Sequence, residues 1–522
     1  MESRGSTVRR LRRSTRRSAL VPLTWALTSV GLGGVGLLGA TWAQAQDGGG
    51  RSTSLSASVD AELSYVVNSR PGGPDSGEFV AQLRPGLQIS SRSGRIVGSL
   101  NYGLGLSHHS RNNDGQNVQH QLNASFSAEA VPRWMYIDGT ATVSQQAASA
   151  FGQQSVAGST RDNPNRIEVA TVSLSPYVRG VLGSAVNYEA RYTGTATNGR
   201  SSVAADSSVS TGSVSLSSAL GGTSIGWGLL ALTQTTDFKA GRETRNDRYS
   251  ASLSYTPDAD LSFSVRGGQE STDVAQISKT TYSNWGVGFT WRPTPRTRLQ
   301  ADTDDRYFGR SYRVLLEHRL ASSSVQFSSS RDSSSGSDPG SAGQRATLYQ
   351  VFFAQFASVQ PNPVLRDLLV LDFLRAQNLD PNALVAGGFL NSGVTVQERH
   401  QLTLSYAGMR MAGSVQAFAS NSRVIDAAAV TPANQDIRQW GFLANASYRL
   451  TPTSTTALTG SHLLTPATAT QGRTELRSLS LSLSEQLARR TSASLSVRYS
   501  VFSSATDPYR EAGITASLSQ RF

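Results

Sequence analysis

The sequence contains no cysteine, and beyond its first 45 residues it has no long apolar run. The missing cysteines exclude disulfides, thiolate metal ligands and cysteine nucleophiles. No internal stretch reaches the roughly 18 to 20 consecutive apolar residues that a membrane-spanning helix requires. Hydrophobic residues make up only 38% of the 522 residues, and the mean hydropathy is −0.28. If the mature chain crosses a membrane, it therefore does so as β-strands.

Histidines are few, and their spacing does not indicate a metal site. His108 and His109 are expected in a loop, and His120 at the start of the next strand. Without further ligands at short fixed spacings, these side chains are expected to be solvated polar groups. No G-x-S-x-G motif, no Ser-His-Asp arrangement and no glycine-rich phosphate loop stands out. We therefore predict no catalytic residues, no metal, no cofactor and no enzymatic activity.

The net charge of +12 is concentrated at the N-terminus. Seven arginines and one glutamate give the first 45 residues a charge of +6, and the rest is spread thinly over the remaining chain. No basic patch is interleaved with aromatic residues, so nucleic-acid binding is not expected.

The first 45 residues have the organisation of a signal peptide. A basic segment at 9–17 precedes an apolar stretch at 19–40, and Ala43-Gln44-Ala45 provides a cleavage site. We predict a signal peptide at 1–45, Gln46 as the mature N-terminus and a flexible leader at 46–53. An uncleaved membrane anchor is the alternative, against which the glycines and the cleavage site argue. Arg16-Arg17 weakly resembles a twin-arginine signal, but an ordinary basic segment explains it as well.

From about residue 54 to the C-terminus, apolar and polar residues alternate in segment after segment. In the first segment Leu55, Val59 and Leu63 alternate with Ser56, Asp60 and other polar residues. Successive side chains of a β-strand point to opposite faces, so each segment is predicted to be a strand with one apolar and one polar face. A soluble β-sandwich is disfavoured because too many strands carry a fully polar face.

Short turns and long loops alternate between the strands, which is typical of an outer-membrane barrel. The predicted fold is an all-β, antiparallel up-and-down transmembrane β-barrel at 54–522, with about 22 strands (about 18 to 24) and both ends on the periplasmic side. The expected strands are 54–68, 78–90, 95–107, 118–131, 134–146, 166–180, 184–194, 207–219, 223–235, 247–257, 260–271, 280–292, 296–308, 311–320, 323–332, 397–408, 411–422, 436–449, 454–464, 474–487, 491–502 and 510–522.

Several short turns combine a proline with aromatic residues. Trp134, Tyr255 and Trp291 lie next to such turns. Proline belongs at strand ends because it cannot donate to the ladder, and aromatic residues at that level fit an interfacial girdle.

The alternation is interrupted at 333–393. Apolar residues at three- and four-residue spacing from Val364 to Phe373 predict a helix, and Asp380-Pro381 predicts the start of a second. We expect a partly helical insertion on the extracellular side that serves as a plug or as a docking segment.

Charged residues on two adjacent predicted strands are candidates for the lumen. Asp302, Asp304 and Arg306 share one face with Gln300, and Arg313, Glu317 and Arg319 share one face of the next strand. They are expected to form either a charged constriction or, as we favour, an ion-pair network that braces the wall. A glycosidase pair formed by Asp302 and Asp304 has no further support in the sequence.

The last strand resembles the C-terminal signal read by the barrel-assembly machinery. Ile514, Ala516, Leu518 and the terminal Phe522 share one face, whereas Gln520 departs from the pattern.

An ordered set of short motifs resembles the outer-membrane β-barrel family associated with PEP-CTERM exopolysaccharide systems of Gram-negative bacteria. The motifs extend from about residue 55 to the C-terminus, and they include 131–138, 143–146, 151–152, 175–177, 188–192, 291–297, 306–309 and 398–400. The resemblance implies an outer-membrane protein from a locus for polysaccharide synthesis and export, without any catalytic residue.

The expected function is a passive conduit, or a component of an export complex, for exopolysaccharide secretion. A general porin or small-solute channel, and a non-conducting assembly anchor, remain as alternatives. The expected partners are outer-membrane lipid, the barrel-assembly machinery, the polysaccharide and periplasmic polysaccharide-export proteins.

Overall fold

The computed structural model describes 52–69, 76–92, 94–111, 118–156, 159, 161, 163–200, 206–218, 224–239, 241–334, 349, 366, 370, 374, 389, 393–426 and 436–522. The predicted signal peptide and its cleavage site, Ala43, Ala45 and Gln46, lie outside the described residues, so they stay predictions.

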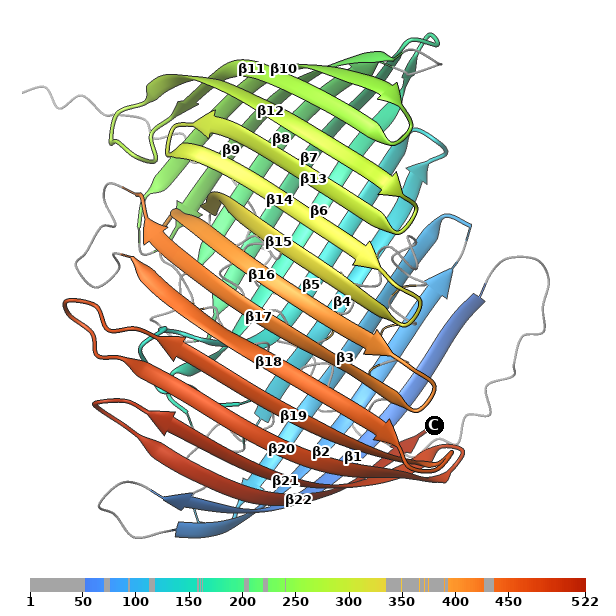
Figure 1. The fold of residues 1–522 in the computed structure, drawn as a ribbon, viewed down its shortest axis with the longest axis vertical. Coiled ribbons are helices and arrows are strands. Elements are labelled where there is room, and N and C mark those ends of the chain that lie inside the picture. Colours follow the sequence, from blue (N-terminus) through green and yellow to red (C-terminus); the bar gives the residue numbers. More distant parts are fainter. Residues whose placement is uncertain are drawn as a thin grey trace, which may run out of the picture. The chain divides into compact units, whose positions relative to one another are not determined.

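The described chain forms one closed sheet of 22 antiparallel strands (Figure 1). Each strand pairs with its neighbours in the sequence, and β1 pairs with β22 to complete the barrel. The predicted antiparallel up-and-down barrel is confirmed. The strands are β1 (Ser52–Ser69), β2 (Ser76–Arg92), β3 (Ile96–His109), β4 (Val118–Val131), β5 (Met135–Ala147), β6 (Arg166–Leu182), β7 (Val186–Gly199), β8 (Ser207–Ser218), β9 (Ile225–Phe238), β10 (Glu243–Asp258), β11 (Leu261–Thr272), β12 (Thr280–Thr294), β13 (Thr297–Arg306), β14 (Gly309–Arg319), β15 (Ser323–Ser334), β16 (Thr395–Ala407), β17 (Met411–Val424), β18 (Ile437–Arg449), β19 (Ser454–Thr465), β20 (Thr474–Ala488), β21 (Thr491–Ser503) and β22 (Tyr509–Arg521).

Strand ends differ from the expected ones by at most five residues. His108 and His109 were expected in a loop, but they are the last residues of β3. Tyr307 was expected within a strand, but it forms a two-residue turn with Phe308. Gly309 follows this turn with a φ of 93°, a conformation that favours glycine.

The alternation places an apolar face on the outside of the barrel. On β20, Leu479, Leu481 and Leu483 are exposed, and the serines between them point inward. So much exposed leucine would be unfavourable in water, but it matches a hydrocarbon environment. The outer surface is therefore the lipid-facing surface.

Exposed aromatic residues lie near both edges of this apolar belt. Trp291, Tyr255 and Trp134 lie near the short-turn end, as expected, and Trp285 and Tyr249 lie toward the other edge. Tryptophan and tyrosine prefer the membrane interface because their rings are amphipathic.

Both ends of the barrel sequence lie at the short-turn end. In the register that closes the barrel, Ser58 of β1 is opposite Arg521 of β22. The backbone N–H of Phe522 also donates to the carbonyl of Ala57 at 2.9 Å. The even number of strands produces this arrangement, as predicted.

The predicted insertion at 333–393 lies mostly outside the described residues. It connects the ends of β15 and β16 that lie opposite the short turns. Within it, the described positions with helical backbone are Tyr349, Arg366, Val370 and Leu374. The two predicted helices and their role stay predictions. In the described part of the chain, no helix is long and apolar enough to cross a membrane.

A charge on the outer face is expected to destabilise the barrel. We expect Leu481→Arg, at a position that is 53% exposed to lipid, to lower the free energy of unfolding by about 2 to 4 kcal/mol. Ser480→Arg, on the inner face of the same strand, is the matched control and should cost much less. Denaturant unfolding in phospholipid vesicles measures both. Equal losses would contradict the assignment of the faces.

Candidate functional site

The inner surface of the barrel is polar, but its exposure is uneven. On β17 and β18, inward residues such as Ser414, Gln416 and Asn445 are buried. On β7 and β13, inward residues such as Arg191 and Asp302 are only half-buried. The lumen wall is therefore accessible at the middle of β7 and β13 and largely covered on β17 and β18.

The loop between β5 and β6 contacts strands on another part of the wall. The Tyr509 hydroxyl at the start of β22 donates to the carbonyl oxygen of Gln154 at 2.7 Å. The Ser159 hydroxyl donates to the buried Glu511 carboxylate at 2.9 Å, and the Gln153 amide donates to Asp507 at 2.7 Å. These contacts join segments more than 350 residues apart in sequence. We call the described residues of this connection, 148–156, 159, 161 and 163–165, the inward loop.

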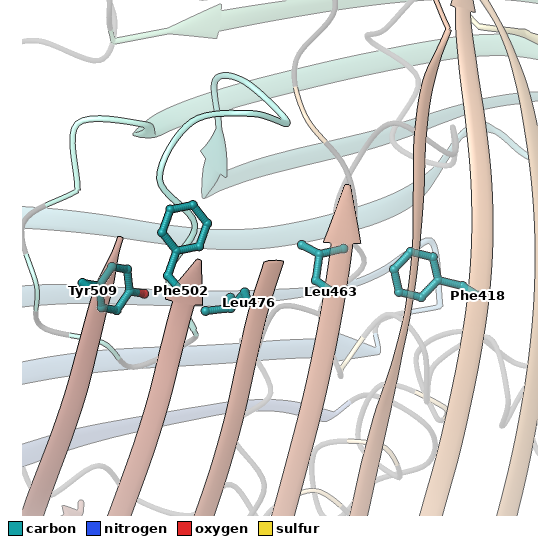
Figure 2. Close-up of a cluster of buried hydrophobic side chains, with 5 residues drawn as sticks. All are labelled: Phe418, Leu463, Leu476, Phe502 and Tyr509. Carbon is teal, nitrogen blue, oxygen red and sulfur yellow. The ribbon is translucent and has the colours of Figure 1, made fainter. Parts of the chain in front are cut away.

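The inward loop lies against a cluster of buried apolar side chains. Figure 2 shows this cluster in a row across the wall, and Val156 of the inward loop packs against it. Inward apolar residues would be unfavourable against water, so the loop shields them. The cluster consists of Phe418, Leu463, Leu476, Phe502 and Tyr509.

The predicted lumen charges Asp302 and Asp304 share one arginine from β11. Arg266 approaches Asp304 to 2.9 Å and Asp302 to 3.3 Å. It reaches across β12, which presents only Gly286 and Gly288 at these positions. A Cβ on Gly288 would lie 2.6 Å from Asp302 Oδ1, and one on Gly286 would overlap Asp304. The two glycines therefore leave room for the bridge.

Arg306 makes a second bridge between strands. Its guanidinium donates to both oxygens of Glu270 on β11, at 2.5 and 3.2 Å, and to Asp332 on β15 at 2.7 Å. Glu270 is fully buried and also accepts a hydrogen bond from Asn246 at 3.0 Å. A buried carboxylate needs such partners to remain charged.

The other three predicted charges contribute less. Arg313 is exposed and makes no ion pair with the described residues, although it is opposite Asp302 in the register. Glu317 accepts a hydrogen bond from Gln326 at 3.4 Å, and Arg319 donates to the carbonyl of Pro295 at 3.4 Å. The sequence analysis did not identify Arg266 and Glu270 as partners of these charges. Both lie on β11, which is separated by β12 from β13, the strand that carries their partners.

The charged network follows the wall. Its bridges join β11 to β13 and β13 to β15, which suits a structural brace. Asp302 and Asp304 are both held by Arg266, so this geometry offers no separately placed acid and nucleophile.

Three motifs of the family resemblance meet at one place on the inner wall. The rings of Tyr136 and Tyr177 stack with centroids 5.2 Å apart, and the Arg191 guanidinium lies 3.7 Å from the Tyr177 centroid. Arg191 also pairs with Asp138 and Glu189, each at 3.0 Å. These side chains form a compact, nearly charge-balanced patch on β5–β7.

A recess of about 640 Å³ lies on the outer face, where β1 and β22 join. It is lined by small and apolar side chains that include Ala61, Ala516 and Leu518. This surface faces lipid, and acyl chains can fill it. The predicted assembly-signal residues Ile514 and Phe522 are likewise exposed beside β1; the role of the signal stays a prediction.

No group of three or more potential metal ligands occurs among the residues that the structure describes. His120 bonds to the Tyr102 hydroxyl at 2.9 Å, and His109 lies 3.7 Å from Glu78.

Closure, a lipid-facing apolar belt and a polar lumen define an integral β-barrel of the bacterial outer membrane. No family model and no curated protein matches the sequence.

Among solved structures, the FrpB iron transporter from Neisseria meningitidis (F5-1 variant) is similar at 10% identity and a TM-score of 0.46, over 89% of this chain and 82% of that chain. The siderophore receptor PirA from Pseudomonas aeruginosa is 9% identical with a TM-score of 0.41, over 90% and 80% of the two chains. OpdQ from the same organism is 11% identical with a TM-score of 0.32, over 90% and 99%.

The ion bridge from Arg266 to Asp302 and Asp304 requires glycine on β12, and this requirement can be tested. Gly286→Ala should displace Asp304 from Arg266 and lower the free energy of unfolding by about 1 to 3 kcal/mol. Gly267→Ala is the matched control, because a Cβ there meets nothing within 4 Å. Denaturant unfolding in vesicles measures both variants, and an equal effect would show that the bridge does not need the gap.

Two hydrogen bonds that hold the inward loop against β22 can be removed without disturbing the barrel. The double variant Tyr509→Phe, Ser159→Ala removes two hydrogen bonds and should make displacement of the loop about tenfold more frequent. Single-channel recording in planar bilayers should then show more frequent high-conductance states. Tyr499→Phe, on the lipid face of β21, is the control. Unchanged recordings from the double variant would mean that these bonds do not hold the loop.

Proposed function

We propose that the protein is a passive conduit through which exopolysaccharide crosses the outer membrane. The proposal takes the substrate from the family resemblance and the route from the polar inner wall of the barrel. The observation that carries it is the chemistry of that wall, where hydroxyl and amide side chains predominate on β6–β10.

Such a wall suits a neutral polymer. Hydroxyl and amide groups exchange hydrogen bonds with sugar hydroxyls at little net cost, because each bond to water is replaced by a similar one. A chain can then advance without being held at any one point. The ion pairs on β11–β15 neutralise one another, so the wall presents few unpaired charges to a passing solute.

The inward loop contacts the inner face of the barrel, and the proposal requires it to move aside when a polymer passes. Its contacts are hydrogen bonds and a small apolar cluster, without a covalent link. In this proposal the short-turn end faces periplasmic export proteins that deliver the polymer.

Deletion of the gene in the native host tests the proposal. We expect secreted polysaccharide to fall to less than about a tenth, with uptake of small hydrophilic solutes unchanged, because the lumen serves the polymer. Wild-type protein and Gly267→Ala should both restore secretion.

Three other outcomes would contradict the proposal. Normal secretion with reduced solute uptake would favour a general porin. Lost secretion with no conductance in planar bilayers, even for the loop-release variant, would favour an assembly anchor. Normal secretion with unchanged uptake would leave no role for the lumen in this pathway.

A further inference from the structure

A cavity of about 320 Å³ lies between the inner wall formed by β6–β10 and residues that cover it from the long-loop end. The wall side includes Thr195, Thr211 and Gln234, and the covering side includes Tyr307 and Val394. Its size suits one or two sugar rings, at the lower end of the range for small-molecule sites.

None of the fourteen residues that line the cavity carries a charged side chain. Burial also raises the pKa of Tyr307 to about 12, so its phenol is neutral at physiological pH. An ionised ligand would lose its hydration here without gaining a counter-charge, which is costly. The lining therefore selects for a neutral ligand.

The wall side is a dense array of hydrogen-bonding groups. Thr211 and Gln234 are directly opposite each other on β8 and β9, and Thr195 lies on the neighbouring β7. Hydroxyl groups both donate and accept, and the amide of Gln234 provides two donors and an acceptor. A ligand with several closely spaced hydroxyls matches this array.

The covering side combines apolar side chains with two serines, Ser333 and Ser334. Tyr307 and Val394 line the cavity with Val274, and together with Phe238 they form a buried cluster. Pyranose rings carry hydroxyls at their edges and C–H groups on their faces. A cavity with hydroxyls on one side and an aromatic ring with valines on the other matches both surfaces of such a ring.

We propose that this cavity is a binding site for a neutral pyranose unit, at which Thr195, Thr211 and Gln234 bond to the sugar hydroxyls and Tyr307 covers a ring face. The inference rests on the proposed function, because it assigns to the polymer route a point at which one sugar unit pauses. It goes further in assigning a defined binding site, with named residues, for one sugar unit of that polymer.

The test is equilibrium binding of maltohexaose to the full-length mature protein in detergent, by isothermal titration calorimetry. We expect saturable binding, with hexagalacturonate and polyethylene glycol of similar mass at least about tenfold weaker, because one is charged and the other lacks donors. Thr211→Val combined with Gln234→Leu should weaken maltohexaose binding at least about tenfold.

A matched variant controls for general effects on the lumen. Ser250 lies on the inner face of β10 but does not line the cavity. The variant Ser250→Val should therefore leave maltohexaose binding unchanged. Retained heat-modifiable mobility on gels would show that each variant is folded. No binding by the folded wild-type protein, equal binding of hexagalacturonate, or equal losses in both variants would overturn the site.

The outcomes for the site and for the conduit are distinguishable. If the deletion strain secretes polysaccharide normally but the protein binds maltohexaose selectively, the proposed function is contradicted and the sugar site is supported. If the deletion strain loses secretion but the protein does not bind maltohexaose, the conduit is supported and the sugar site is contradicted.

Discussion

The structure depends on one set of hydrogen bonds, those between β1 and β22. In hydrocarbon an unpaired backbone N–H or C=O has no water to bond to, so a sheet edge there is very unfavourable. The pairing from Ser58–Arg521 to Ser69–Arg510 removes both edges at once. It also requires the alternation of apolar and polar residues to hold around the whole ring, since a slip of one residue would turn a strand's apolar face inward.

Because closure imposes this pattern everywhere, the sequence predicts the strands well. Their ends differ from the expected positions by a few residues, mainly where a strand continues above the apolar belt, as β7 does to Gly199. The inner features are harder to predict. Phe502 and Tyr509 look like ordinary strand residues, and only the inward loop shows why their rings point inside. Likewise, Arg266 reaches Asp304 across an intervening strand, so adjacent-strand reasoning could not pair them.

The lumen combines two kinds of inner surface. Along β16–β19 many inward positions are buried, and at the ends of β19–β22 the inward loop covers apolar rings. Along β6–β14 the inner wall carries hydroxyls and amides on one part and balanced ion pairs on the other, and it is accessible at the middle of β7 and β13. A solute in the lumen therefore contacts mainly the accessible part of the inner wall, and the chemistry of that part determines which solutes can pass.

The glycines of β12 have a mechanical consequence. Two inward glycines within three residues give this strand a low intrinsic preference for the extended state and leave little side-chain packing on its inner face. Here Arg266 passes over them and clamps the flanking strands from inside. The stretch of wall with the softest backbone is thus reinforced by a side chain from its neighbour, and its local opening is governed by that ion bridge.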